Sequence, residues 1–233
     1  MTTVDSMAPV ADRKTSASQG QGGPNKGLKL TDLCGVIYLA GISAIIFLNV
    51  QTVMALTKAH PLPMSFIKFA LLATFGECLK TRIDTGGWFP KRLLLRACSW
   101  GVFGMWISLC FPFMVGGVDE LIKVGEWPAQ FKVVSLVLWL NYLGGYAFFM
   151  MLTHYWADSM IARGPMWPWA VFGNPGSARW CKIVWCAITF FWNPVHIVTF
   201  SLPPIWRTLW AAYVSMAFGL ILSFAAGRKT SQA

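Results

Sequence analysis

The sequence has few charged side chains for a chain of 233 residues. Asp, Glu, Lys and Arg together make up 12% of it, whereas a soluble globular domain contains about 25%. Hydrophobic residues, in contrast, make up 56%. This balance is typical of an integral membrane protein and argues against an ordinary soluble domain.

The sequence also lacks the signatures of common metal and catalytic sites. Its six Cys residues include no CxxC pair, and no Cys and His residues have the spacing of a zinc site. A metal-binding triad, a nucleophile elbow and a phosphate-binding loop are absent as well. We therefore interpret the cysteines as buried thiols, and we expect neither enzymatic activity, nor a metal, nor a cofactor.

Acidic residues are the scarcer of the two charged classes. There are nine of them against 19 Lys and Arg, so the formal net charge is +10. The basic residues are spread between apolar segments and are not gathered in one patch, which argues against nucleic acid as a partner. The expected partners are the lipid bilayer and small solutes, and the sequence leaves homo-oligomerisation open.

Long apolar runs are what the sequence has in abundance. A helix that crosses a membrane needs about 20 mostly apolar residues. Six stretches meet this requirement: 32–56, 62–83, 93–115, 131–153, 180–201 and 205–226. They predict an all-α fold, a polytopic transmembrane helix bundle over residues 31–227, between a disordered polar tail, 1–30, and a short basic tail, 228–233. A four-span version, with 62–83 and 180–201 re-entrant or interfacial, remains open.

The basic residues are distributed unequally between alternate connections. Fourteen of the 19 lie in the amino-terminal tail, in segments 80–96 and 163–182, and at 228–229. With six spans, all these segments fall on one side of the membrane. Since Lys and Arg are enriched on the cytoplasmic side, this excess predicts that both termini are cytoplasmic.

Glu77 is an acid inside an apolar stretch. A carboxylate at the centre of a bilayer costs about 2.5–3.5 kcal/mol on insertion scales, so Glu77 should face the bundle interior and have a partner. Either it pairs with Lys80 or Arg82 near the inner surface, or it lines a pore. Lys68, nine residues earlier, is expected to extend its long side chain to the outer interface.

Pro194 interrupts the fifth stretch. Because proline has no N–H and clashes with the preceding turn, it should kink the helix and free carbonyls near residue 190. Such carbonyls are tolerated at membrane depth only if they are buried in protein or face water. Asn193 and His196 flank the kink. We expect them either to satisfy the freed groups or to line a pore.

Arg207 follows the Pro203–Pro204 pair and falls in the first turn of the last helix. A cation is unfavourable at this end of a helix dipole, so Arg207 needs a partner. The candidates are the last carbonyls of the fifth helix, or the acids of the outer loop, which are Asp119, Glu120 and Glu126.

Two further expectations concern other helices. His154 and Asp158 have the i, i+4 spacing of a hydrogen-bonded pair. Gly116 and Gly117 are expected to end the third helix.

The candidates for a pore or a polar core are therefore the polar and helix-breaking residues of these stretches. They are Glu77, Lys80, Asn193, Pro194, His196 and Arg207.

Two sets of residues, His60-Pro61 with Gly76-Glu77 and Pro203 with Arg207, Leu222 and Ser223, resemble motifs of the peroxisomal membrane protein 22 kDa family, which includes a mitochondrial inner-membrane member and bacterial relatives. His60 and Pro61 precede Gly76 and Glu77 at the interval of the family's His-Pro and Gly-Asp pairs, with Glu in place of Asp. Near the carboxyl end, Pro203, Arg207, Leu222 and Ser223 match the family in register, and Phe218 stands where the family has Trp. The family's Gln and Asn-Phe match His196, Thr199 and Phe200 only with a one-residue slip.

The resemblance covers about 56–224 and is strongest to the bacterial branch. It implies a multi-pass protein of a cell membrane, namely the bacterial inner membrane. The alternative location is the mitochondrial inner membrane. The mitochondrial member is proposed to form a channel. We therefore expect a small-solute channel or pore, with a non-conducting structural or assembly protein as the alternative and a membrane-embedded enzyme as the least favoured function.

Overall fold

The computed structural model describes residues 27–172 and 177–227, with side chains as far as Phe218. All regular secondary structure in this part is helical, which confirms the expected all-α class. The predicted tails fall outside the described residues, apart from 27–30. The helices are α1 (Leu30–Leu48), α2 (Val50–Ala59), α3 (Pro61–Thr85), α4 (Leu93–Lys123), α5 (Lys132–Leu138), α6 (Tyr146–Arg163), α7 (Pro168–Phe172), α8 (Ser177–Ala187), α9 (Asn193–Ser201) and α10 (Pro204–Gly227).

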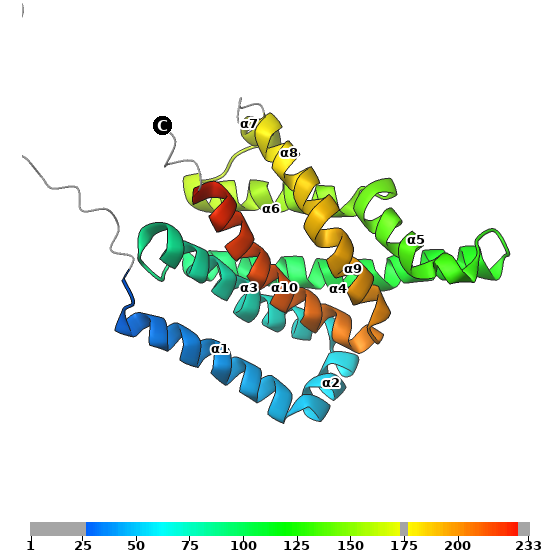
Figure 1. Ribbon diagram of the computed structural model, residues 1–233, viewed down its shortest axis with the longest axis horizontal. Coiled ribbons are helices and arrows are strands. Elements are labelled where there is room, and N and C mark those ends of the chain that lie inside the picture. Colours follow the sequence, from blue (N-terminus) through cyan, green and yellow to red (C-terminus); the bar gives the residue numbers. More distant parts are fainter. Residues whose placement is uncertain (1–26, 173–176, 228–233) are drawn as a thin grey trace, which may run out of the picture.

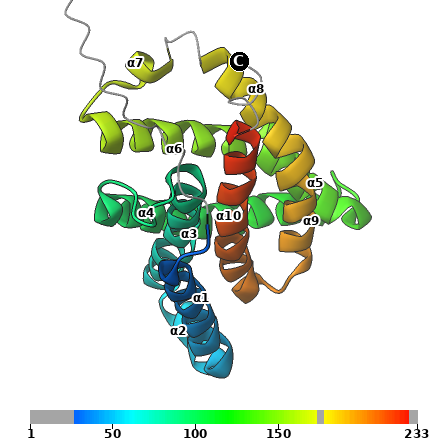
Figure 2. The ribbon, with the colours of Figure 1, turned by 60° about the vertical axis from the view of Figure 1, so that its left-hand side comes forward.

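Three helices, α3, α4 and α10, form the centre of the fold. Helix α3 packs along both α4 and α10, and their buried faces contribute Phe69, Leu72, Ile107 and Leu209 to one hydrophobic core. Figures 1 and 2 show α1 and α2 on one side of this centre and α6, α7 and α8 on the other. In Figure 1 the start of α1 and the end of α10 lie at the same end of the bundle.

Glycines allow the central helices to approach each other closely. A Cβ atom added to Gly76 would lie 2.8 Å from the Cα atom of Met216, so the α3 and α10 backbones touch at this position. On α4, a Cβ atom at Gly104 would lie 2.6 Å from the ring of Phe69. Small residues at such crossings increase van der Waals contact between helices, which is how helices associate in lipid.

Two of the six expected spans are interrupted. The chain bends at Asn49, between α1 and α2. The expected span 131–153 is broken at Gly144–Gly145, after a π-helical turn at Trp139–Leu143, and its two halves meet at 45°. Gly145 has φ 64°, a left-handed conformation that is easiest for glycine, so the bend is encoded locally.

The third helix is longer than expected. We predicted that Gly116 and Gly117 end it, but α4 continues to Lys123. No atom of the described part of the chain lies within 4 Å of a Cβ atom built at either glycine, and both remain helical. The helix ends where Gly125, at φ 81°, adopts the left-handed conformation that terminates helices.

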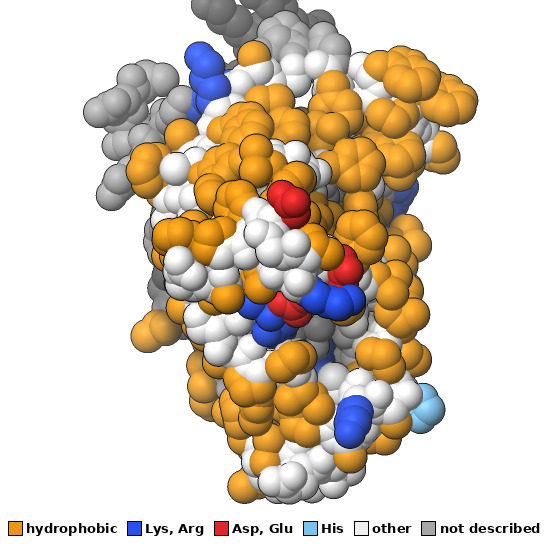
Figure 3. All heavy atoms as spheres, turned by 90° about the vertical axis from the view of Figure 1, so that its right-hand side faces the viewer, with side chains coloured by type: hydrophobic (Ala, Val, Ile, Leu, Met, Phe, Trp, Pro, Cys, Tyr) orange, Lys and Arg blue, Asp and Glu red, His pale blue; other side chains and the backbone are white. Residues whose placement is uncertain are grey.

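Several helices are long and apolar enough to cross a membrane. Within the described residues these are Leu30–Leu48, Pro61–Thr85, Leu93–Lys123 and the continuous helical segment Ser177–Ser201, and the bent pair of Ala129–Leu143 and Tyr146–Arg163 makes five if it counts as one span. Helix α10 is not included, because its side chains are described only as far as Phe218. Figure 3 shows the end of the molecule that lies at the right in Figure 1: hydrophobic side chains cover most of it, and acidic and basic ones gather near its middle.

Candidate functional site

Glu77 is held by two side chains of α4. Its Oε2 atom accepts a hydrogen bond from Nη1 of Arg96 at 2.7 Å, and its Oε1 atom accepts one from Nε1 of Trp100 at 2.6 Å. Arg96 and Trp100 are four residues apart, so they lie on the same face of α4. The side chain of Glu77 is only 15% exposed. The expected interior position is therefore found, but the expected partners are not.

Lys80 and Arg82, the partners considered from the sequence, bind other acids. Lys80 pairs with Asp84 one turn further along α3, at 2.5 Å. Arg82 reaches across to Asp32 at the start of α1, with contacts of 2.6 and 2.8 Å. The prediction assumed a partner on the same helix. Instead, α4 packs closely on α3, and side chains of α4 bind Glu77.

Helix α6 adds two further polar residues to this cluster. Asp158 accepts from Arg96 at 3.4 Å and lies 3.4 Å from Nδ1 of His154, which confirms the predicted i, i+4 contact. The His154 ring stacks against Trp100, with 4.2 Å between ring centroids. Its Nε2 atom is buried and has no hydrogen-bond partner among the residues that the structure describes. Three helices thus place two carboxylates, a guanidinium and an imidazole together.

This cluster lines a cavity of about 340 Å³, which we call the Glu77 cavity. The aromatic residues Trp100, Phe103, Tyr155, Trp180 and Trp192 form much of its wall. Two of the three hydroxyl-bearing residues in the wall donate to carbonyls of their own helices: Thr81 to Glu77 and Ser215 to Ala211, each at 2.8 Å. The cavity therefore has a charged side and an aromatic side.

The same cluster offers ligand atoms to a metal ion. Atoms of Glu77, His154 and Asp158 all lie within 4.8 Å of one another. However, Arg96 already donates to both carboxylates. A metal ion would have to displace this guanidinium, which has the same sign of charge, so the arrangement favours the ion pair.

A second polar network lies around Asn193 and His196. Asn141 donates to Oδ1 of Asn193 at 2.6 Å, and its own Oδ1 is 2.9 Å from Nδ1 of His196. Asn193 in turn donates to the Tyr142 hydroxyl at 2.7 Å. Asn141 is completely buried. The network joins the bend before α6 to the start of α9.

The distortion at Pro194 differs from the expected kink. The turn Ile188–Trp192 is π-helical, and the N–H of Asn193 donates to the carbonyl of Ile188. This wider turn accommodates the proline ring. The Asn193 and His196 side chains do not bind freed carbonyls as expected, because Asn141 and Tyr142 occupy them.

Arg207 binds neutral carbonyls. Its Nε atom donates to Leu202 at 3.1 Å and its Nη2 atom to Phe200 at 3.4 Å, so the second of the two expected kinds of partner is found. The guanidinium also lies over the Phe200 ring. Arg207 lines a cavity of about 620 Å³ at the other end of the bundle, which we call the Arg207 cavity.

Lys68 does not reach the interface as expected. Its side chain is buried, with 4% of the residue exposed, and its Nζ atom donates to Oγ1 of Thr57 at 2.7 Å. Thr57 itself forms part of the wall of the Arg207 cavity. The contact between α2 and α3 covers the lysine, a tertiary effect that spacing along the chain does not show.

A small cavity lies between the two large ones. It has a volume of about 30 Å³, includes His196 in its wall, and we call it the His196 cavity. Its wall shares Met150, Met151, Trp192 and Ser215 with the Glu77 cavity. Phe111 belongs to both the His196 cavity and the Arg207 cavity. The His196 cavity is therefore a neighbour of both the Glu77 cavity and the Arg207 cavity.

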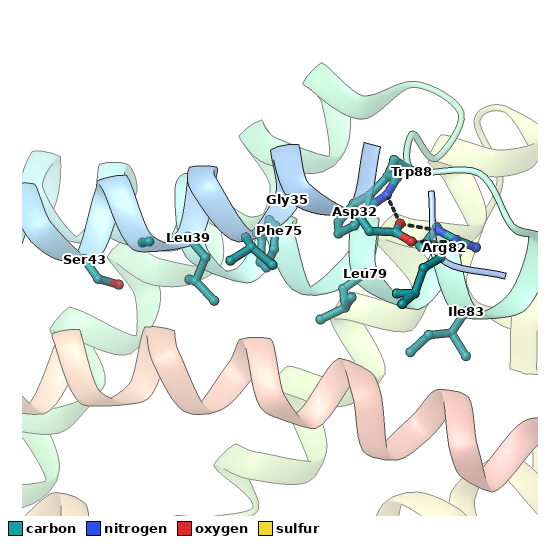
Figure 4. Close-up of a pocket in the computed structure, with 12 residues that line it drawn as sticks. Asp32, Gly35, Leu39, Ser43, Phe75, Leu79, Arg82, Ile83 and Trp88 are labelled. Carbon is teal, nitrogen blue, oxygen red and sulfur yellow. Dashed lines mark hydrogen bonds and ion pairs between the residues drawn. The ribbon is translucent and has the colours of Figure 1, made fainter. Parts of the chain in front are cut away.

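A separate groove is lined by residues of α1 and α3. It has a volume of about 740 Å³ and is mostly apolar. Figure 4 shows Asp32, Arg82 and Trp88 gathered at one end of it, with Leu39 and Ser43 further along α1. Trp88 donates to Asp32 at 2.8 Å, so this end fixes the start of α1 to the bundle.

The residues of the family resemblance have mostly structural positions. His60 precedes α3, Pro61 is its first residue, and Gly76 allows the contact with α10. Pro203 lies in the turn before α10. Leu222 and Ser223 belong to the part of α10 whose side chains are not described.

Sequence reasoning missed Arg96, Trp100 and Asn141 as members of the polar clusters. Arg96 and Trp100 do have the spacing of a single helix face, but that pattern gives no indication of the helix that they contact.

No protein-family model matches the chain, and neither a curated protein nor a solved structure does. The family resemblance therefore stays a prediction.

Proposed function

We propose that this protein is a multi-pass membrane protein that conducts a small polar solute along the line of the Glu77, His196 and Arg207 cavities. The observation on which the proposal depends is that the His196 cavity shares wall residues with both large cavities. Charged side chains line each of the two large cavities. Ionisable groups at membrane depth are costly, and they commonly mark solute or ion pathways.

Six crossings fit the helices. The four long apolar segments, the bent pair ending in α6, and α10 would each cross once. In favour of this count, the start of α1 and the end of α10 lie at the same end of the bundle (Figure 1), as an even number of crossings requires. The excess of basic residues on this side supports cytoplasmic termini, and a cell membrane of the bacterial inner type as the location.

The described conformation is closed in the middle. A volume of about 30 Å³ is large enough for one water molecule but not for a larger solute. Phe111 and Trp192 form the walls on its two sides. Conduction therefore requires these side chains to move, as expected of a pathway that is gated by an apolar constriction.

A structural or assembly role is the second candidate function. The buried network of Asn141, Asn193 and His196 favours it, because these groups satisfy one another and have no need of a solute. Such a network locks helices together and fixes their register. An enzyme is the least favoured function, since two hydroxyls of the Glu77 cavity, those of Thr81 and Ser215, donate to helix carbonyls and not to a base.

The proposal is tested by reconstituting the pure protein in planar bilayers. We expect conductance that falls when Glu77→Gln removes a charge from the pathway. Glu120→Gln is the matched control, because Glu120 is exposed, pairs with Lys123 and lies outside all three cavities. Absence of conductance, or equal conductance in the wild type and Glu77→Gln, would favour the structural role.

A further inference from the structure

The Arg207 cavity has a basic wall. Lys58 of α2 and Arg207 of α10 line it, together with the hydroxyl-bearing residues Thr57, Ser108 and Thr208. No acidic residue is among the described residues that line it. Ammonium, guanidinium and hydroxyl groups are all hydrogen-bond donors, so the polar part of this wall suits an acceptor of negative charge.

Lys68 adds a buried positive charge directly behind this wall. Its ammonium group has three donors, and within the described chain its acceptor is the Thr57 hydroxyl. No carboxylate of the described residues lies within 4 Å of it, since it takes part in none of their ion pairs. A buried charge without a counter-ion is costly, and an anion nearby would offset part of that cost.

Arg207 likewise forms no ion pair with a carboxylate of the described residues. It donates to the carbonyls of Phe200 and Leu202, which are neutral. Asp119 is close enough to interact with it electrostatically, but Asp119 is itself paired with Lys132. The positive end of the α10 dipole falls in the same place, because α10 begins at Pro204, which lines the cavity.

The opposite end of the pathway is different. There, Arg96 interacts with two carboxylates, on Glu77 and Asp158, so its charge is balanced within the protein. The unbalanced positive charge of the pathway is therefore concentrated at the Arg207 cavity.

We propose that the Arg207 cavity binds a small anion with a carboxylate or phosphate group. Arg207 and Lys58 contact it directly, and Lys68 attracts it from behind Thr57. The assignment of this anion as the conducted solute rests on the function proposed above, whereas binding is a property of the cavity alone. The anionic group belongs either to a free solute or to the headgroup of a lipid.

Binding is measured by calorimetric titration of the purified full-length protein with inorganic phosphate and with acetate. A second arm compares nanodiscs of phosphatidylcholine with nanodiscs that contain phosphatidylglycerol, and counts retained lipid by mass spectrometry. Saturable binding of a free anion identifies a solute site. Selective retention of phosphatidylglycerol without binding of either free anion identifies a headgroup site.

Three variants locate the site. Arg207→Gln should weaken binding about tenfold or more, as expected for the loss of a charge-assisted hydrogen bond. Lys58→Gln, at an exposed position that does not threaten folding, should weaken binding by a smaller factor. Lys123→Gln is the control, because Lys123 is exposed and lies outside the cavity. Its affinity should equal that of the wild type.

The proposal is overturned if neither free anion nor anionic lipid binds, or if Arg207→Gln and Lys58→Gln, both folded, bind as the wild type does. It is also overturned if Lys123→Gln weakens binding as much as they do, since binding would then be non-specific. Anion binding without conductance in bilayers keeps this site and rejects the proposed function; conductance without anion binding does the reverse.

Discussion

The guanidinium of Arg96 in the first turn of α4 lies 2.7 Å from the carboxylate of Glu77 on α3. The two residues are 19 positions apart, and both side chains are largely buried, at 18% and 15% exposure. The contact joins the two helices that form the largest interface of the fold, and it lies in the wall of the Glu77 cavity. It therefore contributes both to stability and to the charge of the proposed pathway.

Removal of one member of this pair should destabilise the protein. Glu77→Gln leaves the more distant Asp158 as the one carboxylate of the described residues that pairs with Arg96, and we expect a loss of about 1.5–3 kcal/mol, as for hydrogen bonds to charged groups. The measurement is thermal unfolding in detergent. Glu120→Gln, at an exposed ion pair, should change stability by less than about 1 kcal/mol. Equal losses in the two variants would show that the buried position of Glu77 has no energetic importance.

The contact between α3 and α10 at Gly76 should not tolerate a methyl group. In Gly76→Ala, the new Cβ atom meets the backbone of Met216, which cannot rotate away, so the helices must separate. We expect a loss of about 1–3 kcal/mol from overpacking. Gly116→Ala is the matched control: it faces open space within a helix and should gain about 0.5–1 kcal/mol. A Gly76→Ala protein as stable as this control would contradict the close approach.

In the network of Asn141, Asn193 and His196, removing one of two bonded side chains should destabilise the protein by more than half as much as removing both. His196→Leu leaves the Asn141 oxygen buried without this partner, and we expect a cost of about 1–3 kcal/mol. The double variant His196→Leu with Asn141→Leu removes both groups and should cost less than the sum of the single losses. Unfolding midpoints of the four proteins give this coupling. Strict additivity would mean that the two side chains do not interact.

The threading of the chain can be tested separately from its function. Both termini should be on the cytoplasmic side, and Lys58 of α2, at the Arg207 cavity, on the opposite side. Reporters fused to each end, and labelling of a Cys placed by Lys58→Cys in a Cys-free background, report these positions. A terminus on the same side as residue 58 would contradict the six-span arrangement.

Local patterns in the sequence predicted much of the fold but little of the polar contacts. The apolar runs predicted helices, and the spacing of His154 and Asp158 predicted their contact, because both depend on neighbours along one helix. The partner of Glu77 could not be predicted in this way. It depends on the closeness of α3 and α4, which Gly101 and Gly104 permit by accepting the rings of Phe66 and Phe69.

Lys68 and the break at Gly144–Gly145 illustrate two further limits. A lysine near the end of an apolar stretch usually extends to the interface, but here the packing of α2 over α3 buries it against Thr57. The stretch 131–153 has the length and composition of one helix, but the left-handed φ of Gly145, after the π-helical turn, bends the chain within it. Average hydrophobicity contains no information about either feature.

The central claim, that the three cavities form one closed pathway, is tested most directly by solute flux into liposomes that contain Phe111→Ala. Phe111 separates the His196 cavity from the Arg207 cavity, whereas Phe113 is exposed and belongs to neither, so Phe113→Ala is the control. With glycerol and acetate as solutes and the folded fraction checked by gel filtration, we predict faster flux of at least one solute in Phe111→Ala and wild-type flux in Phe113→Ala. Identical flux in all three folded proteins would contradict the pathway.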